Sequence, residues 1–249
     1  MKLFRATSVI ATALIIPCLI LASPAGKEKD SATKSVDSGS FGIFMNGVRV
    51  GTETFTITQT QNGSSIQSEF KAEGSAGQAV QGSELQLMSN GDLRRYEWKE
   101  VSPGKGQSVV LPNDQFLVQR WSGGPQEKEQ EQPYLLSAST NILDDYFFVH
   151  REVLAWKYLA SICSQKDGQL ACTGKQAAKF GTLNPHQRAS ALTSMEYVGR
   201  EKANVKGVEK DLNKLELKGE TGTWTLWLDD QFKLLRISIP AEKTEVTRD

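Results

Sequence analysis

Residues 41–60 read F-G-I-F-M-N-G-V-R-V-G-T-E-T-F-T-I-T-Q-T, and this stretch decides the fold class. Two strand-like runs meet at Asn46-Gly47, a dipeptide that tolerates the positive φ angles of a tight hairpin turn. Phe55 and Ile57 alternate with threonines, which predicts a strand with one buried and one solvated face. The stretch therefore predicts an antiparallel hairpin.

The same turn signal recurs, because Asn62-Gly63 and Asn90-Gly91 separate further runs in which apolar and polar side chains alternate. The predicted strands are 41–45, 48–60, 64–72, 84–89 and 92–101, and later 175–183, 192–200, 212–217, 221–228 and 232–239. In the strand 221–228, Trp227 points away from the side shared by Trp224 and Leu226. We therefore expect both faces of this strand to be covered.

Residues 142–162 are predicted to form one long helix. Apolar residues recur along it at helical spacing: Leu143, Phe147, Leu154 and Tyr158. Ser139 or Asn141 is expected to cap its start, and Asp144 and Asp145 fall in the first turn, where the helix dipole favours negative charge. Together, the patterns predict a mainly β protein in which a strongly curved antiparallel sheet, or incomplete β-barrel, wraps around this helix.

The first 25 residues have the layout of a secretory signal peptide. Lys2 and Arg5 precede an apolar run, and small residues allow cleavage after Ala25 or after Ala22. The apolar run is short for a membrane span. We therefore expect a periplasmic or secreted protein without a transmembrane span after cleavage.

The rest of the chain is predicted to hold one β-rich domain at residues 41–240. Segments 26–40 and 241–249 are charged and lack large apolar side chains, so that they bury little surface on folding. We expect a disordered linker and a disordered tail there.

The cysteines predict one structural disulfide. Cys163 and Cys172 are the two left after signal cleavage, and an oxidising compartment favours their pairing across a short polar loop with an Asp-Gly turn signal. Cys18 does not predict a lipid anchor, because it follows Pro17 where lipoprotein processing needs a small residue.

Charge argues against nucleic acid and anionic lipid headgroups as partners. The chain has 29 basic and 29 acidic side chains, and loss of Lys2 and Arg5 leaves 27 against 29, a formal charge of −2. Nucleic acids and anionic headgroups are bound largely through clusters of lysine and arginine, and this chain has none.

No catalytic, metal or cofactor motif stands out. Of the two histidines, His150 and His186, the first could transfer a proton if Asp144 or Asp145 oriented it. No nucleophile elbow, paired metal-binding histidines or glycine-rich phosphate loop accompanies it. We therefore predict no catalytic residues, no metal site and no cofactor, and we rank a hydrolytic enzyme third among the functions.

The aromatic side chains suggest where a ligand would bind. A curved sheet that presents aromatics toward a helix either packs shut as a core or leaves an apolar cavity, and the sequence leaves both readings open. If a ligand exists, we expect these residues to line its site: Trp98, Phe147, Trp156, Tyr158 and Trp224.

Strands, one long helix and further strands behind a signal peptide resemble the exported bacterial incomplete β-barrels typified by the lipoprotein-localisation carriers. A closer likeness is to an uncharacterised exported bacterial family, through F-x-x-x-x-N-G-x-x-x-G at 41–51 and W-x-L-W-L-D-x-x-x-x-L-x-x-I at 224–237. The likeness covers most of the mature chain, and it brings no catalytic residues.

These observations lead us to expect a non-catalytic envelope protein that holds a lipid or another apolar small molecule in the concave face of its sheet. The alternative is a structural or interaction protein that docks another envelope component.

Overall fold

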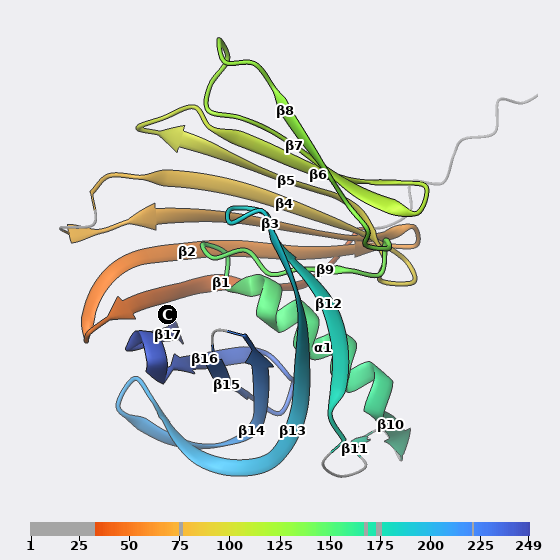
Figure 1. The fold of residues 1–249 in the computed structure, drawn as a ribbon. Coiled ribbons are helices and arrows are strands. Elements are labelled where there is room, and N and C mark those ends of the chain that lie inside the picture. The colour runs from red at the N-terminus through yellow and green to blue at the C-terminus, as the bar shows by residue number, and fades with distance from the viewer. Residues whose placement is uncertain (1–32, 75–76, 167–168, 173–175, 221) are drawn as a thin grey trace, which may run out of the picture. The chain divides into compact units, whose positions relative to one another are not determined.

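The computed structural model describes residues 33–249 except 75–76, 167–168, 173–175 and 221 (Figure 1). The predicted signal peptide, residues 1–25, lies outside the described residues, as does the first part of the predicted linker.

A sheet of 15 strands makes up most of the described chain. Its strands are β1 (Lys34–Met45), β2 (Val48–Thr60), β3 (Gly63–Ala72), β4 (Val80–Met88), β5 (Leu93–Ser102), β6 (Gln107–Asn113), β7 (Phe116–Ser122), β8 (Gln130–Tyr134), β9 (Asn141–Ile142), β12 (Ala178–Asn184), β13 (Ala189–Val205), β14 (Val208–Gly219), β15 (Gly222–Leu228), β16 (Leu234–Ile239) and β17 (Thr244–Arg248). The other elements are the helix α1 (Val149–Ile162), a hairpin of β10 (Cys163–Lys166) and β11 (Gln169–Cys172), and the short 3-10 helix η2 (Pro240–Glu242).

The sheet consists of two antiparallel meanders, β1 to β8 and β12 to β17. They are joined where β1 pairs antiparallel with β17, so that strands from the two ends of the sheet-forming chain are neighbours. At the far edge of the second meander, β9 pairs parallel with β12. Figure 1 shows α1 between the two meanders.

The Asn-Gly hairpins predicted from the sequence are confirmed. Asn46 and Gly47 have φ angles of 51° and 78° in the turn between β1 and β2. Gly63 has a φ of 143°, and a Cβ atom there would lie 1.9 Å from the carbonyl oxygen of Leu87. Glycine is therefore required at this turn.

The mainly β class is also confirmed, and the sheet is mixed but mostly antiparallel; it is not closed or strongly curled. This corrects the expected strongly curved sheet or incomplete β-barrel. In the described residues β8 pairs only with β7, and the two-residue β9 pairs only with β12.

The helix is shorter than the predicted 142–162, because α1 begins at Val149. Ile142 belongs to β9, and the amide of Leu143 donates to the carbonyl of Leu183 at 3.0 Å. The segment before the helix is therefore held in extended contact with β12.

The start of α1 is capped from a distant strand, and not by Ser139 or Asn141. The carboxylate of Glu53 in β2 accepts hydrogen bonds from the amides of Phe148 at 2.7 Å and Val149 at 3.3 Å. A carboxylate at a helix N-terminus is favoured by the helix dipole. A cap that comes from another part of the chain leaves no local sequence signal.

The predicted disordered segments 26–40 and 241–249 largely form strands where they are described, which corrects both predictions. β1 begins at Lys34, and β17 occupies most of the expected tail. Arg248 in β17 donates to both carboxylate oxygens of Asp37 in β1 at 2.8 Å. In the sheet, residues 34–40 pair with β2, and residues 244–248 pair with residues 41–45 and with β16. Each polar segment is therefore ordered by strands outside it, which its own composition does not reveal.

Strands β6, β7 and β8 also extend the sheet beyond the predicted strands. Pro112 in β6, Pro133 in β8 and the charged run before β8 lower the strand signal. Pro133 is tolerated because β8 is an edge strand.

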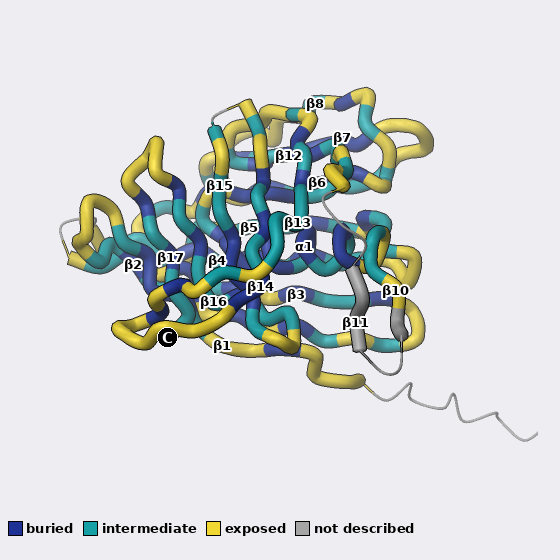
Figure 2. The backbone as a smooth tube through the Cα atoms, turned by 90° about the horizontal axis from the view of Figure 1, so that it is seen from below, coloured by how far each residue is buried: buried dark blue, intermediate teal, exposed yellow. Residues whose placement is uncertain are grey.

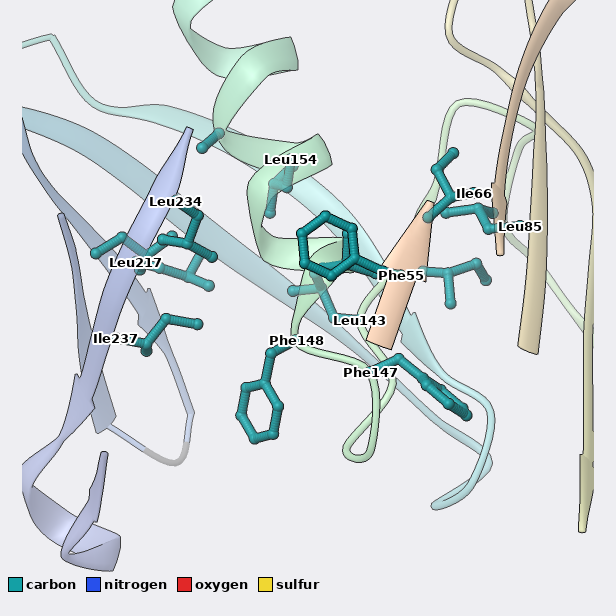
Figure 3. Close-up of a cluster of buried hydrophobic side chains, with 14 of the residues drawn as sticks. Phe55, Ile66, Leu85, Leu143, Phe147, Phe148, Leu154, Leu217, Leu234 and Ile237 are labelled. Atoms are coloured by element: carbon teal, nitrogen blue, oxygen red, sulfur yellow. The ribbon is translucent and has the colours of Figure 1, made fainter. Parts of the chain in front are cut away.

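The main hydrophobic core lies between α1 and the two meanders (Figures 2 and 3). Phe55, Leu154 and Ile237 are at most 4% exposed and come from the first meander, the helix and the second meander. A smaller cluster contains Trp227 together with Leu212, apart from the main core. The expectation that both faces of β15 are covered is confirmed.

Cys163 and Cys172 face each other in the register of the β10–β11 hairpin. Residues directly opposite in an antiparallel pair have Cα atoms at a spacing that a disulfide accepts. The disulfide itself stays a prediction. Across the described ranges, no helix has the length and apolar character needed to cross a membrane.

Candidate functional site

A cavity of about 450 Å³ lies beside the first turn of α1, between the helix and strands β12 to β16. We call it the Arg151 cavity. Apolar side chains provide most of its wall, and polar side chains are interspersed. It is lined by Leu143, Asp145, Phe148, Arg151, Thr182, Asn184, Gln187, Ala189, Ser190, Ala191, Thr193, Leu217, Gly219, Glu220, Trp224, Ile239 and Glu242.

The side-chain directions before the helix explain why space remains there. Phe147 and Phe148 point to opposite sides of the chain, toward the first and the second meander (Figure 3). Phe148 lies across from Trp224, with ring centroids 6.3 Å apart. On the opposing strand β13, Ala189 and Ala191 are too small to fill the gap.

Arg151 is the distinctive residue of this cavity. It is 3% exposed, and its Nη1 atom donates to the backbone carbonyls of Asp144 and Phe147. Its guanidinium carbon lies 4.6 Å from the ring centroid of Trp224 and 5.4 Å from that of Phe148. Two aromatic faces and two carbonyls thus hold the guanidinium in place.

No carboxylate within the described residues lies within 4.0 Å of this guanidinium, and its Nε atom is buried without a hydrogen-bond partner there. Burial lowers the pKa of Arg151 below its ordinary value, while Asp145 and Asp144 act in the opposite direction. The guanidinium nevertheless stays charged at any physiological pH. A buried cation without an ion-pair partner among the described residues therefore borders an open volume.

The acidic side chains that line the cavity are hydrogen-bonded to other side chains or exposed to solvent. Asp145 accepts hydrogen bonds from Asn184 at 2.7 Å and from Gln187 at 2.8 Å. Glu220 and Glu242 are exposed to solvent. The cavity thus combines an apolar wall and one buried cation with carboxylates that are in contact with water.

A second cavity, of about 490 Å³, lies along α1 near the β4–β5 turn. Lys157 lines it, but its ammonium already contacts the carbonyls of Gly91 and Ser139 at 3.3 Å and the Asn141 side chain at 3.1 Å. These three acceptors satisfy the three donors of the ammonium. This cavity therefore offers a ligand less specific recognition than the Arg151 cavity does.

His150 lines the second cavity without a hydrogen bond from either ring nitrogen to any described residue. Burial lowers its pKa from 6.5 to about 3, so that the imidazole is neutral at physiological pH. Neither acid proposed to orient His150 bonds to it: Asp145 binds Asn184 and Gln187, and Asp144 binds His186.

Asp144 is the centre of a buried polar cluster. Its Oδ2 atom accepts the hydroxyl of Tyr96 at 2.6 Å and lies 2.6 Å from Nδ1 of His186. Burial would raise the pKa of Asp144, but the hydrogen bond and charge of His186 lower it below its ordinary value. The other ring nitrogen of His186 lies 2.9 Å from Oε1 of Gln81, and Trp98 stacks on the ring at 4.1 Å. Because both ring nitrogens have protein partners, the cluster holds the loop after β12 in place.

The five aromatic residues expected to line a ligand site lie in different surroundings. Phe147 and Tyr158 are fully buried in the core, and Trp98 packs on His186. Trp156 lines the second cavity, and its indole donates to the carbonyl of Phe232 at 2.6 Å. Trp224 lines the Arg151 cavity.

The sequence contains a signal for Arg151 that the expected site residues do not include. Phe147, Arg151, Leu154 and Tyr158 are spaced by four, three and four residues, and all four are buried. Arg151 is therefore a charged residue on the buried stripe of an amphipathic helix. Buried charges are normally paired, so a charge in this position indicates a functional candidate.

Within the described ranges, no group of three or more His, Cys, Asp or Glu side chains is arranged to hold a metal ion. Comparison of the chain with protein-family profiles, with curated proteins and with solved structures gave no match. The resemblance to an exported bacterial family therefore stays a prediction.

Proposed function

We propose that this protein is an exported, non-catalytic binding protein that holds an apolar small molecule, such as a lipid or an acyl chain, in the Arg151 cavity. The observation that carries the proposal is the cavity itself, an apolar-walled volume of about 450 Å³ beside the helix. Sites for small molecules typically have volumes of about 300–1,000 Å³ and apolar walls with a few polar anchors. The export signal read from the first 25 residues supports an envelope location.

The packing around α1 supports this cavity over a site spread along the helix. Phe147 and Tyr158 are fully enclosed by protein, which leaves no room for a ligand against them. The small side chains of β13 leave volume open across from Trp224. A ligand there would bury apolar wall that is otherwise in contact with water, and burial of apolar surface is favourable.

A matched pair of substitutions on β13 tests the proposal. Ala191 lines the cavity, while its neighbour Leu192 is 61% exposed. Adjacent residues of a strand point to opposite faces, so Ala191→Trp fills the cavity and Leu192→Trp adds the same side chain elsewhere. Binding of a fluorescent fatty-acid probe is measured for both variants and for the unmodified protein.

We expect Ala191→Trp to lose at least about 10-fold in probe affinity, a change of ~1.4 kcal/mol, and Leu192→Trp to keep it. Absence of probe binding in the unmodified protein, or equal binding by both variants, would overturn the proposed site. Native mass spectrometry of protein taken from its own envelope provides a second test. Lipid adducts of mixed mass support a carrier, whereas ligand-free protein bound to one stoichiometric protein partner supports the docking alternative.

A further inference from the structure

We infer that the ligand of the Arg151 cavity is a monocarboxylate with an apolar body, whose carboxylate group is bound by Arg151. This inference rests on the proposed function and adds the chemistry of the bound group. It is carried by a buried guanidinium that lies beside an apolar-walled cavity and has one edge without a hydrogen-bond partner among the described residues.

The first step is the cost of burying the charge. An unpaired ion that leaves water loses hydration worth several kcal/mol, which is why buried charges are normally paired. Arg151 is 3% exposed, yet in the part of the chain that the structure describes no carboxylate comes within ion-pair distance of it. The two aromatic rings and two carbonyls around it offset part of this cost without supplying a negative charge.

The second step concerns the donors of the Arg151 side chain that have no partner among the described residues. All side-chain hydrogen bonds that Arg151 makes to described residues come from Nη1. The opposite edge of the guanidinium, formed by Nε and Nη2, has no such partner, and Nε is buried. Two parallel N–H groups on one edge match the two oxygens of a carboxylate.

The third step concerns the class of anion. Glu220 and Glu242 border the same cavity and are exposed, and Asp145 lies in its wall. Like charges disfavour an anion that carries two or more charges, such as a phosphate monoester. A ligand with a single carboxylate can pair with Arg151 while it is repelled least by these acidic side chains. Leu217, Trp224 and the other apolar wall residues accommodate the apolar body of such a ligand.

Two ligands that differ only in the head group test the inference on the unmodified protein. Decanoate and decanol are titrated against the bound fluorescent probe at neutral pH. We expect decanoate to bind at least about 10-fold more tightly, which corresponds to ~1.4 kcal/mol. Equal affinities would overturn the carboxylate inference and leave the proposed function intact. Failure of both ligands to displace the fluorescent probe would count against the proposed function itself.

Substitutions then identify the residue responsible. Arg151→Met removes the charge, and Arg151→Lys keeps the charge but removes the two-pronged edge. Arg188→Met is the matched control, because Arg188 also lies over an aromatic ring, that of Trp121 at 5.0 Å, but does not line the cavity. We expect Arg151→Met to lose the preference for decanoate while decanol still binds, Arg151→Lys to keep only part of the preference because it retains the charge, and Arg188→Met to retain it in full.

Folding is checked by circular dichroism before each titration. If an Arg151 variant does not fold, the comparison of the two ligands on the unmodified protein still decides the inference. A folded Arg151→Met protein that keeps the full preference for decanoate would overturn the assignment to Arg151.

Discussion

The Nη2 atom of Arg248 donates hydrogen bonds of 2.8 Å to both carboxylate oxygens of Asp37, a residue 211 positions earlier in the chain. The ammonium of Lys233 lies 3.0 Å from the same carboxylate. Asp37 is 3% exposed, so this ion-pair group ties β1 to β17 and to the residue that precedes β16, within a largely buried environment.

We predict that Asp37→Asn destabilises the protein by about 3 kcal/mol, because removing one partner of a buried ion pair leaves the other charges uncompensated. Urea denaturation measures the loss. Asp249→Asn breaks a more exposed ion pair with Arg49 and should cost far less. Equal losses for the two variants would contradict the structural importance of Asp37.

The pH dependence of this loss follows from the pKa of Asp37. Burial would raise the pKa, but hydrogen bonds from Lys233 and Arg248 lower it below 3.8. A lowered folded-state pKa contributes stability above the unfolded-state value, and this stability disappears as the pH falls through the folded-state value. The stability difference between the parent protein and Asp37→Asn should therefore shrink in strong acid.

Glu53 predicts a pH dependence of the opposite sign. Burial raises its pKa from 4.5 to about 7, against the hydrogen bonds from Ser68 and from the start of α1. The protein gains stability from protonated Glu53 below pH 4.5, and it loses this stability as the pH rises through about 7. We expect Glu53→Gln to flatten the pH dependence of unfolding in this window, because an amide does not titrate. Denaturation curves at several pH values test this, and an unchanged slope would refute the assignment.

The hydroxyl of Tyr96 should contribute more to stability than an ordinary tyrosine hydroxyl does, because its acceptor Asp144 is an ionised and fully buried carboxylate. We expect Tyr96→Phe to cost about 1.5–3 kcal/mol, the range for hydrogen bonds to charged groups. Tyr134→Phe is the control, since the hydroxyl of Tyr134 donates to the neutral side chain of Gln119 at 3.0 Å. Its loss should be about 1 kcal/mol. A larger loss for the control would show that Asp144 is not the stronger acceptor.

Alanine substitutions of Phe147 and Trp224 distinguish a side chain that packs in the core from one that lines the cavity. Phe147 is fully buried, and its replacement by alanine should cost about 3–5 kcal/mol by thermal or chemical denaturation. Trp224 is partly exposed and already borders a void, so Trp224→Ala should cost less stability but should reduce binding of the fatty-acid probe. A stability loss for Trp224→Ala as large as that for Phe147→Ala, without any change in binding, would place Trp224 in the core.

The hairpin register of Cys163 and Cys172 predicts that protein recovered from an oxidising compartment resists alkylation of both thiols until it is reduced. Closing so short a loop should add about 2–3 kcal/mol of stability in the chain-entropy model. Intact mass after alkylation, with and without reductant, gives the answer. Alkylation of both cysteines without reductant would exclude the bridge.

Local patterns were sufficient to predict much of the sheet and little of the site. The Asn46-Gly47 turn and the alternation around Phe55 are encoded within a few residues, so the hairpins follow from the sequence. The cap of α1 by Glu53 depends on a residue 95 positions from Phe148, and the pairing of Asp37 with Arg248 spans nearly the whole chain. Such partners come together only in the folded protein, and composition alone therefore suggests disorder where strands form.

Part of the environment of Arg151 could have been predicted from the sequence. Its place on the apolar stripe of the helix is visible in the sequence. That no carboxylate of the described ranges lies beside it depends on which strands pack against the helix. The cavity likewise depends on small residues of β13 that lie far from the helix in the sequence.

The pairing of β1 with β17 has a consequence for the order of folding. Each meander is built from neighbouring hairpins, which form quickly because short loops cost little entropy to close. The joint between the meanders needs residues 41–45 to find residues 244–248, a contact between segments about 200 positions apart. We therefore expect this late, non-local step to limit the rate of folding. During synthesis or export, the two meanders cannot be joined through β1 and β17 until β17 is available.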